Sequence, residues 1–284
     1  MTLCVNLPCA RVSRRTLLAT GALVVFTAMP DAAAAAAADR STDKDVKALI
    51  ERIDHERDRF EDQLDGELKH SILRGPGGEV HVERYLDDLQ ENIKKLKERF
   101  STDYAASAEV TAVLRQGGDI SRFIASKPPN FDGASEWNRL AASLSQLAAV
   151  YGTRMPVPDG QVARRVNDRE VKGTTTQIAK DADHFKEELE ASLKRDASVN
   201  KPTREAAATA VEDLKADAKR LGSLAGEGRP ASGEARALLD RAAVIRSTIG
   251  GRTLSPQAQA AWGAIETSLD TVAWAFGLPP QGHP

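Results

Sequence analysis

The amino-acid sequence predicts an all-α protein made of two tandem four-helix units behind an N-terminal export signal. Apolar residues recur at three-, four- and seven-residue steps over most of the chain, which is typical of helices with one buried face. The sequence lacks the sustained alternation of apolar and polar residues that would indicate strands. Residues 45–155 also match residues 170–280 at a single offset of 125 positions without a gap, which indicates tandem duplication of one folding unit.

The matches at this offset are mostly apolar residues of the kind that fill a core. They include Val46/Val171, Ile53/Ile178, Phe60/Phe185, Leu64/Leu189, Leu89/Leu214, Leu96/Leu221, Leu114/Leu239, Ile120/Ile245, Trp137/Trp262 and Leu144/Leu269. We expect Trp137 and Trp262 to be equivalent core residues, each near the start of the fourth helix of its unit and packed on that unit's first helix.

The offset and the composition together divide the chain into five parts. These are an export signal at residues 1–38, a first helical unit at 42–152, a linker at 153–166, a second helical unit at 167–278 and a tail at 279–284. Each unit has about 110 residues, which is enough for its own hydrophobic core. The linker contains Pro156 and Pro158, and it is either a loose connection or the lead-in to a longer first helix of the second unit.

The first 38 residues have the three parts of an export signal: basic residues, a short apolar core that ends near Met29, and a small-residue tail. The apolar run is too short to span a bilayer comfortably, which takes about 20 residues. Its start, Ser13-Arg14-Arg15-Thr16-Leu17-Leu18, resembles the twin-arginine signal that exports folded proteins. Arg14 and Arg15 are therefore the predicted export determinants, with an ordinary secretory signal as the alternative and cleavage expected within residues 32–38.

In the first unit, the apolar spacing predicts a first helix with inward positions from 46 to 68, followed by helices over residues 80–100, 106–125 and 134–152. Thr42 and Asp45 suit a capping pair at the start of the first helix. The run Gly75-Pro76-Gly77-Gly78 is expected to end the first helix, and Gly152 is expected to end the fourth.

The second unit repeats this plan. Asn167 and Glu170 suit a capping box, and Ser255 before Pro256 suits an N-cap with proline in the first turn. The glycine pairs at 117–118 and 250–251 are interpreted as helix ends.

Charge and cysteine content restrict the class of function. The net charge is −2, and it becomes −4 when residues 1–38 are removed. This mildly acidic body argues against a nucleic-acid partner and, more weakly, against an anionic membrane surface, and no stable membrane span is expected after processing. Both cysteines, Cys4 and Cys9, lie in the signal, so the processed chain has no thiol for a disulfide, a zinc site or a nucleophile.

No catalytic residue, metal site or cofactor is predicted. The sequence lacks the two inward Glu-x-x-His pairs that a di-iron bundle needs. His184 follows Asp181 at a suitable spacing, but the matching residues are Glu56 and Arg59, so His184 is interpreted as a surface residue. Met155, the only methionine after the signal, lies in the linker instead of an inward position suited to haem. Gly-x-Ser-x-Gly and phosphate-binding glycine loops are absent from the sequence as well.

Seven polar residues of the first unit recur unchanged 125 positions later in the second unit. We interpret them as ion pairs, caps and solvated faces, with a duplicated binding face as the alternative. They are Lys47/Lys172, Asp58/Asp183, Lys69/Lys194, Asp88/Asp213, Lys94/Lys219, Glu109/Glu234 and Ser143/Ser268.

A longer pattern is clearest in the second unit. It runs Ile178-x6-Phe185-x3-Leu189-x3-Leu193, then Val211-Glu212-Asp213-Leu214, then Leu254-Ser255-Pro256 with Gln259-x2-Trp262 and Leu269. In this pattern the chain resembles a group of exported bacterial proteins built from tandem four-helix units, for which no function is known. The resemblance covers nearly all of the chain after the signal, although the first unit has Pro129-Asn130-Phe131 in place of Leu-Ser-Pro. It implies the fold and the export, and it implies no activity, ligand or catalytic residue.

The sequence therefore predicts a non-catalytic interaction or structural protein of the cell envelope, periplasmic or secreted, because stacked helices offer long faces to partners. The expected partners are the twin-arginine export machinery, a signal peptidase and an envelope protein. An envelope enzyme or cofactor-carrying bundle that is exported folded is the main alternative. A small-ligand or lipid pocket between the units is a third possibility.

Overall fold

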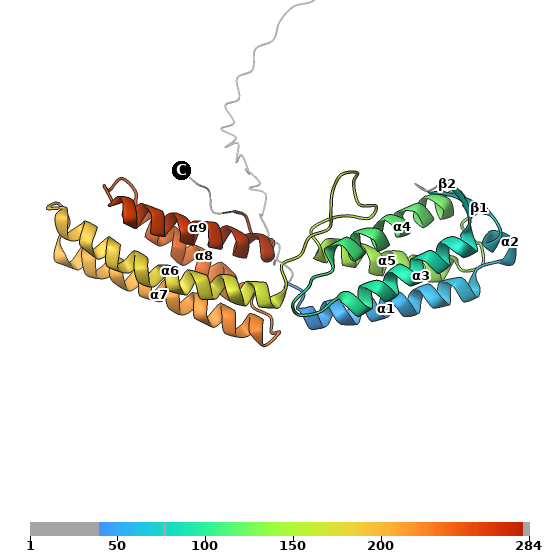
Figure 1. Cartoon of the computed structure of the whole chain (residues 1–284), viewed down its shortest axis with the longest axis horizontal. Helices are drawn as coiled ribbons and strands as arrows, with labels where there is room; N and C mark the ends of the chain where they lie inside the picture. Colours follow the sequence, from blue (N-terminus) through green and yellow to red (C-terminus); the bar gives the residue numbers. More distant parts are fainter. Residues whose placement is uncertain (1–39, 76–77, 281–284) are drawn as a thin grey trace, which may run out of the picture. The chain divides into compact units, whose positions relative to one another are not determined.

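The computed structural model describes residues 40–75 and 78–280, and most of these residues are helical (Figure 1). The protein is thus mainly α-helical, as the sequence predicted. The first unit contains α1 (Asp43–Gln63), α2 (Gly66–Lys69), α3 (Val82–Arg99), α4 (Ser107–Ala125) and α5 (Ala134–Val150). The second contains α6 (Asp168–Arg195), α7 (Lys201–Gly226), α8 (Ser232–Ile249) and α9 (Pro256–Ala275).

The predicted helix starts are confirmed. Thr42 caps α1 by accepting the amide of Asp45 at 3.3 Å, and the Asp45 carboxylate accepts the amide of Thr42 at 2.9 Å. The Thr42 hydroxyl also donates to the Asp45 carboxylate at 2.7 Å, and this bond, followed by the bond from the Thr42 amide, lowers the pKa of Asp45. Asn167 and Glu170 form the same reciprocal box at α6. Ser255 accepts the amide of Ala258 at 3.1 Å, with proline in the first turn of α9.

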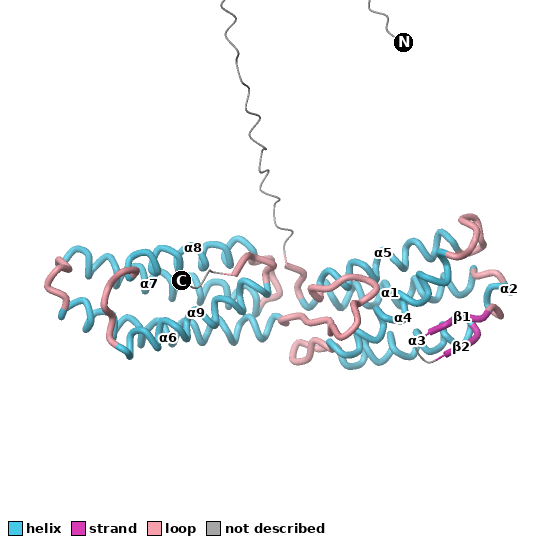
Figure 2. Tube along the Cα trace, turned by 90° about the horizontal axis from the view of Figure 1, so that it is seen from above, coloured by secondary structure: helices cyan, strands magenta, loops and turns pink. Residues whose placement is uncertain are grey.

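The expectation that the chain has no strands is wrong. The segment after α2 forms a small antiparallel hairpin of β1 (Ile72–Gly75) and β2 (Gly78–His81), in which Ile72 pairs with His81 (Figure 2). Each strand has four residues, which is too short to produce a readable alternation. Leu73 anchors the hairpin in the first unit's core, where its side chain is 1% exposed.

The first helix also ends earlier than its apolar spacing suggested. Leu64 is extended, and the Asp65 carboxylate accepts the amides of Glu67 and Leu68 to start the short α2. An aspartate that can cap a new helix therefore competes with continuation of the old one. Leu68, expected in the core, is only partly buried.

The glycine pair at 117–118 does not end a helix, because both residues lie within α4. A Cβ on Gly117 would come within 2.7 Å of Leu144, and a Cβ on Gly118 within 2.5 Å of Pro156. These glycines are required for close packing of α5 and the linker on α4. The other pair ends α8 as expected, with Gly251 at a φ of +75°.

The linker is neither loose nor the beginning of a longer α6. Val157 and Ala163 are buried in the first unit's core. The amide of Ala163 donates to the Thr111 hydroxyl at 2.9 Å, and the amide of Arg164 donates to the Tyr151 carbonyl at 3.1 Å. The linker is thus ordered and packs mainly on the first unit, whereas Val166 at its end is buried in the second unit's core.

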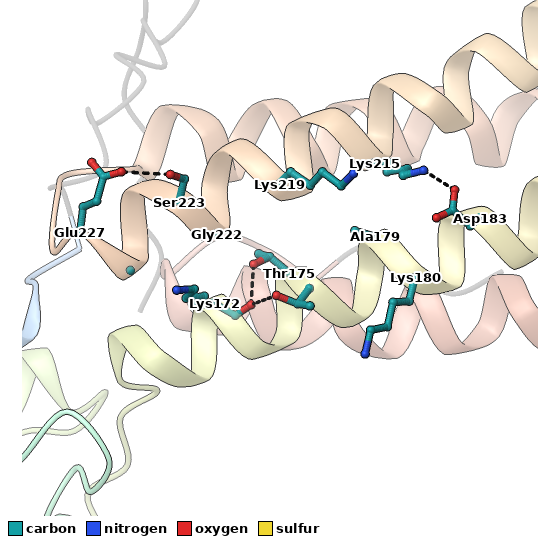
Figure 3. Close-up of a pocket in the computed structure, with 12 residues that line it drawn as sticks. Lys172, Thr175, Ala179, Lys180, Asp183, Lys215, Lys219, Gly222, Ser223 and Glu227 are labelled. Carbon is teal, nitrogen blue, oxygen red and sulfur yellow. Dashed lines mark hydrogen bonds and ion pairs between the residues drawn. The ribbon is translucent and has the colours of Figure 1, made fainter.

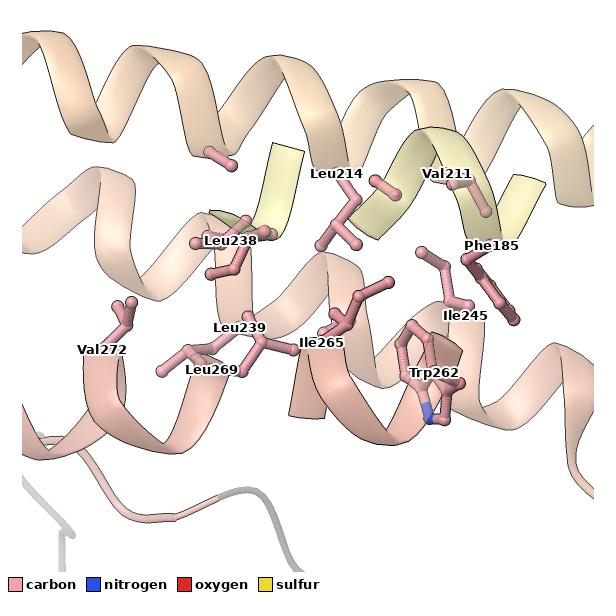
Figure 4. Close-up of a cluster of buried hydrophobic side chains, with 14 of the residues drawn as sticks. Phe185, Val211, Leu214, Leu238, Leu239, Ile245, Trp262, Ile265, Leu269 and Val272 are labelled. Atoms are coloured by element: carbon pink, nitrogen blue, oxygen red, sulfur yellow. The ribbon is translucent and has the colours of Figure 1, made fainter. Parts of the chain in front are cut away.

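Each unit has a separate core built around one aromatic pair. The rings of Phe60 and Trp137 lie 5.3 Å apart, and those of Phe185 and Trp262 lie 5.1 Å apart. Both tryptophans are buried and pack on the first helix of their own unit, as predicted. Figure 4 shows the second of these cores, in which Ile245 lies beside Phe185 and Trp262, and Leu238 and Leu269 continue the core along the bundle.

Two buried arginine–aspartate pairs join the starts of α1 and α6. Arg165 pairs with Asp43, and Arg40 pairs with Asp168. The amide of Asp43 donates to Asp168 at 2.8 Å, and the amide of Asp168 donates to Asp43 at 3.1 Å. Each arginine also donates to a carbonyl, Arg40 to Val166 at 2.6 Å and Arg165 to Ser41 at 2.8 Å. Every member of this network has its counterpart 125 residues away.

The environment of this junction is unusual for charged groups. Asp43, Arg165 and Asp168 are each less than a tenth exposed. Burial, and then the neighbouring Arg165, lowers the pKa of Arg40. The aspartates satisfy amides that a helix start leaves without an intrahelical acceptor, and their charge is favourable at that end of the helix dipole.

The aromatic pairs generate a stability prediction. Trp137→Ala and Trp262→Ala should each lower the free energy of unfolding by about 3–5 kcal/mol, because each leaves a cavity against a phenylalanine. Since each core belongs to one unit, hydrogen exchange resolved along the sequence should show early opening of the mutated unit only. Trp274→Ala is the control, because that indole is 44% exposed. Equal opening of both units in either core variant would mean that the units unfold as one.

The junction generates a second prediction. Asp43→Ala removes the closest carboxylate of the buried Arg165 and leaves only Asp168, 4.0 Å away, and this should cost about 3–5 kcal/mol in urea unfolding. Asp103→Ala removes the exposed partner of Arg169 and should cost about 1 kcal/mol or less. The double variant Asp43→Ala/Arg165→Ala should cost less than the sum of its single changes. Equal losses in the Asp43 and Asp103 variants would contradict the assigned role of the junction.

Candidate functional site

The candidate site is a surface groove between α6 and α7 in the second unit, here called the α6–α7 groove. Its volume is about 470 Å³, within the range of about 300–1,000 Å³ typical of small-molecule sites. Figure 3 shows its side chains, which come from both helices. The lining residues are Lys172, Thr175, Thr176, Ala179, Lys180 and Asp183 from α6, and Lys215, Lys219, Gly222, Ser223, Gly226 and Glu227 from the last four turns of α7 and its C-cap.

Small residues bring the two helices close together at one end of the groove. A Cβ on Gly222 would lie 2.4 Å from the Thr175 hydroxyl, and a Cβ on Gly226 would lie 2.9 Å from the Lys172 side chain. Gly222 is inside α7, where glycine costs about 1 kcal/mol relative to alanine. The close approach of α7 to Thr175 requires this glycine, since the Thr175 side chain is held in place by a bond to the Lys172 carbonyl at 3.0 Å.

Both carboxylates of the groove are already neutralised. Lys215 forms an ion pair with Asp183, and this contact raises the pKa of Lys215 (Figure 3). Glu227 accepts from the Ser223 hydroxyl at 3.0 Å and from Arg229 at 3.3 Å, and both contacts lower its pKa. The cations of Lys215 and Arg229 therefore offset the two carboxylates of the groove.

Three lysines of the groove remain without such compensation. Within the described part of the chain, Lys172, Lys180 and Lys219 form no ion pair. All three are exposed. Lys172 and Lys219 lie within the groove, whereas Lys180 is at its rim and points away from α7 in Figure 3. The groove thus carries excess positive charge on a protein whose net charge is −2.

The first unit fills the matching place in a different way. There, Lys97 of α3 forms ion pairs with Glu51 at 2.9 Å and Asp54 at 2.5 Å on α1. These three positions correspond to Gly222, Thr176 and Ala179 in the second unit. The surface hollow beside this ion pair has five carboxylates and two lysines, whereas the α6–α7 groove has two carboxylates and four lysines. The second unit therefore has a positive opening where the first unit has a bridged and acidic surface.

The retained polar positions divide into two groups. Most of the acidic ones form ion pairs, as expected: Asp58 with Arg57, Asp183 with Lys215, Asp213 with Arg241 and Glu109 with Arg99. The lysines at two matched positions, Lys47/Lys172 and Lys94/Lys219, form no ion pair within the residues that the structure covers. The structure brings Lys172, Asp183 and Lys219 together in the groove.

The remaining sequence-based expectations concern export and metal binding. Arg14 and Arg15 lie outside the described residues. His184 is exposed, as expected. Glu67 and His70 have the Glu-x-x-His spacing, but both are exposed on the short α2. Over residues 40–75 and 78–280, no group of three or more histidine, cysteine, aspartate or glutamate side chains is arranged to hold a metal ion.

Two features were missed from the sequence. The junction had a usable signal, because Arg40/Arg165 and Asp43/Asp168 obey the same offset just before residues 45–155 and 170–280. The groove had a weaker one, since only Lys172, Asp183 and Lys219 among its residues match their counterparts. Its other lining residues differ between the units, and a search for retained residues passes over them.

No protein-family model matches the chain, and neither the search of curated proteins nor the search of solved structures finds a match. In the described segments, none of the helices combines the length and the apolar character needed to cross a membrane.

Proposed function

We propose that this protein is an exported, non-catalytic interaction protein of the bacterial cell envelope, which binds its partner through the α6–α7 groove. The observation that carries the proposal is the difference between the two matched sites. The first unit closes the site with Lys97, Glu51 and Asp54, and the second has small residues at all three positions. The aromatic core pair is the same in both units.

We further propose that the two units arose by tandem duplication. We also propose that the chain belongs to the group of exported helical proteins that its sequence resembles. After duplication, packing constrains the core of both copies, while exposed positions are free to differ and can acquire a new role. The twin-arginine-like segment supports a periplasmic or secreted location, with the processed chain soluble. Fast-folding helical units with local contacts suit export in the folded state.

Export can be tested through the two arginines of the signal. Arg14→Lys with Arg15→Lys keeps the positive charge but removes the guanidinium pair by which a twin-arginine signal is recognised. We expect precursor to accumulate in the cytoplasm, as measured by fractionation and immunoblotting. Arg11→Lys, outside the pair, is the control and should be exported normally. Normal processing of the double variant would assign the chain to the general secretory route.

Partner binding can be tested by photo-crosslinking in intact cells. A photoreactive amino acid at Thr176, which lines the groove and is exposed, should capture a discrete envelope partner. The same amino acid at Glu51, the matching position of the first unit, is the control and should not capture it. Capture at both positions alike, or at neither, would contradict a partner bound through the groove.

A further inference from the structure

We infer that the α6–α7 groove binds a ligand through a phosphate group. This inference rests on the proposed function, because it names the chemistry that the binding face recognises. The groove holds an excess of ammonium groups, has the volume of a small-molecule site and lies within a single unit.

The charge balance of the groove selects an anion. Asp183 and Glu227 are occupied by Lys215 and Arg229, so these carboxylates do not neutralise the other lysines. Lys172 and Lys219 face the groove without an ion-pair partner among the described residues, and Lys180 adds a third positive charge at the rim. A phosphomonoester carries a charge of about −1.5 to −2 at neutral pH, which two ammonium groups can balance, and a phosphodiester carries less.

The type of cation selects phosphate over carboxylate. The lining of the groove contains lysines and no arginine. A planar guanidinium matches a carboxylate through two parallel hydrogen bonds, whereas an ammonium is a compact charge that can approach any oxygen of a tetrahedral phosphate. The hydroxyls of Thr175 and Thr176 already donate to the Lys172 carbonyl, at 3.0 and 2.7 Å, so the lysines supply the free donors.

The opening itself is specific to the second unit. In the first unit Lys97 forms ion pairs with Glu51 and Asp54, and these carboxylates would repel an anion. In the second unit Ala179 and Gly222 remove both the carboxylate and the bridging lysine, yet Lys172 and Lys219 are kept. Lys219 is thus exposed to a ligand in the second unit, whereas its counterpart Lys94 lies among carboxylates in the first.

This contrast provides a matched experiment. Lys172→Gln/Lys219→Gln and Lys47→Gln/Lys94→Gln remove the same charge from matching, exposed positions of the two units. Binding of inorganic phosphate and of pyrophosphate to the processed chain would be measured by titration calorimetry, with circular dichroism melting to verify the fold. We expect saturable binding at one site per chain. The second-unit variant should weaken it about tenfold or more for each lysine lost, since hydrogen bonds to charged groups are involved. The first-unit variant should leave it unchanged.

A third arm distinguishes the source of the phosphate. Phosphatidylcholine vesicles with and without phosphatidylglycerol would be tested for co-sedimentation. Binding that requires the anionic lipid and Lys172 with Lys219 assigns the phosphate to a lipid headgroup, and binding of soluble phosphates alone assigns it to a free ligand.

Two outcomes would overturn the inference: equal weakening in both lysine variants, which would indicate a general charge effect, or no saturable binding to any of the probes. If partner capture at Thr176 persisted without phosphate binding, the inference would be wrong and the proposed function would stand. If phosphate bound but Thr176 captured no partner, the inference would stand and the protein-partner proposal would fail.

Discussion

The buried arginine–aspartate network at the starts of α1 and α6 is the constraint on which the rest of the structure depends. A buried ion pair seldom adds net stability over a well-packed apolar pair, because desolvation offsets the attraction. Here, however, the four side chains also satisfy helix-start amides and the carbonyls of Ser41 and Val166. The network thereby specifies where both first helices begin. Because a helix places residues on its faces by their distance from its start, this also sets which faces of α1 and α6 carry Phe60 and Phe185.

Much of the fold could be predicted from the sequence, because periodicity and caps are local properties. The 3.6-residue spacing located the long helices, and Thr42, Asn167 and Ser255 located three of their starts. The errors occurred where tertiary contacts outweigh local signals. The two glycines at 117 and 118 predict a helix end, yet they are needed inside α4 for close packing on Leu144 and Pro156. The four-residue strands β1 and β2 are held by pairing and by Leu73, and neither leaves a periodic trace.

The candidate site was less predictable for a different reason. Matching positions identify what two units share, which is mainly their packing, and they led to Lys172, Asp183 and Lys219 without showing that these residues line one groove. Whether a retained lysine is compensated depends on its neighbours in space. Lys97 forms ion pairs with residues one helix away, whereas Lys219 has no ion-pair partner among residues 40–75 and 78–280. For the junction, the offset identifies Arg40/Arg165 and Asp43/Asp168 as retained residues, but it does not show that they are buried and paired with one another.

The two matched surfaces also show why a binding face can differ while the core stays the same. The ion pairs of Lys97 are partly exposed, and such pairs contribute about 1 kcal/mol or less, so their loss costs the second unit little. Gly222 lowers the stability of α7 by about 1 kcal/mol relative to alanine, because glycine has a low helix propensity. The close packing of α7 on Thr175 offsets this loss. Neither change touches Phe185 or Trp262, which carry the larger packing energy. Surface residues that each contribute little to the free energy of unfolding can therefore be replaced in one unit without unfolding it. Binding should accordingly depend on the positions at which the two units differ.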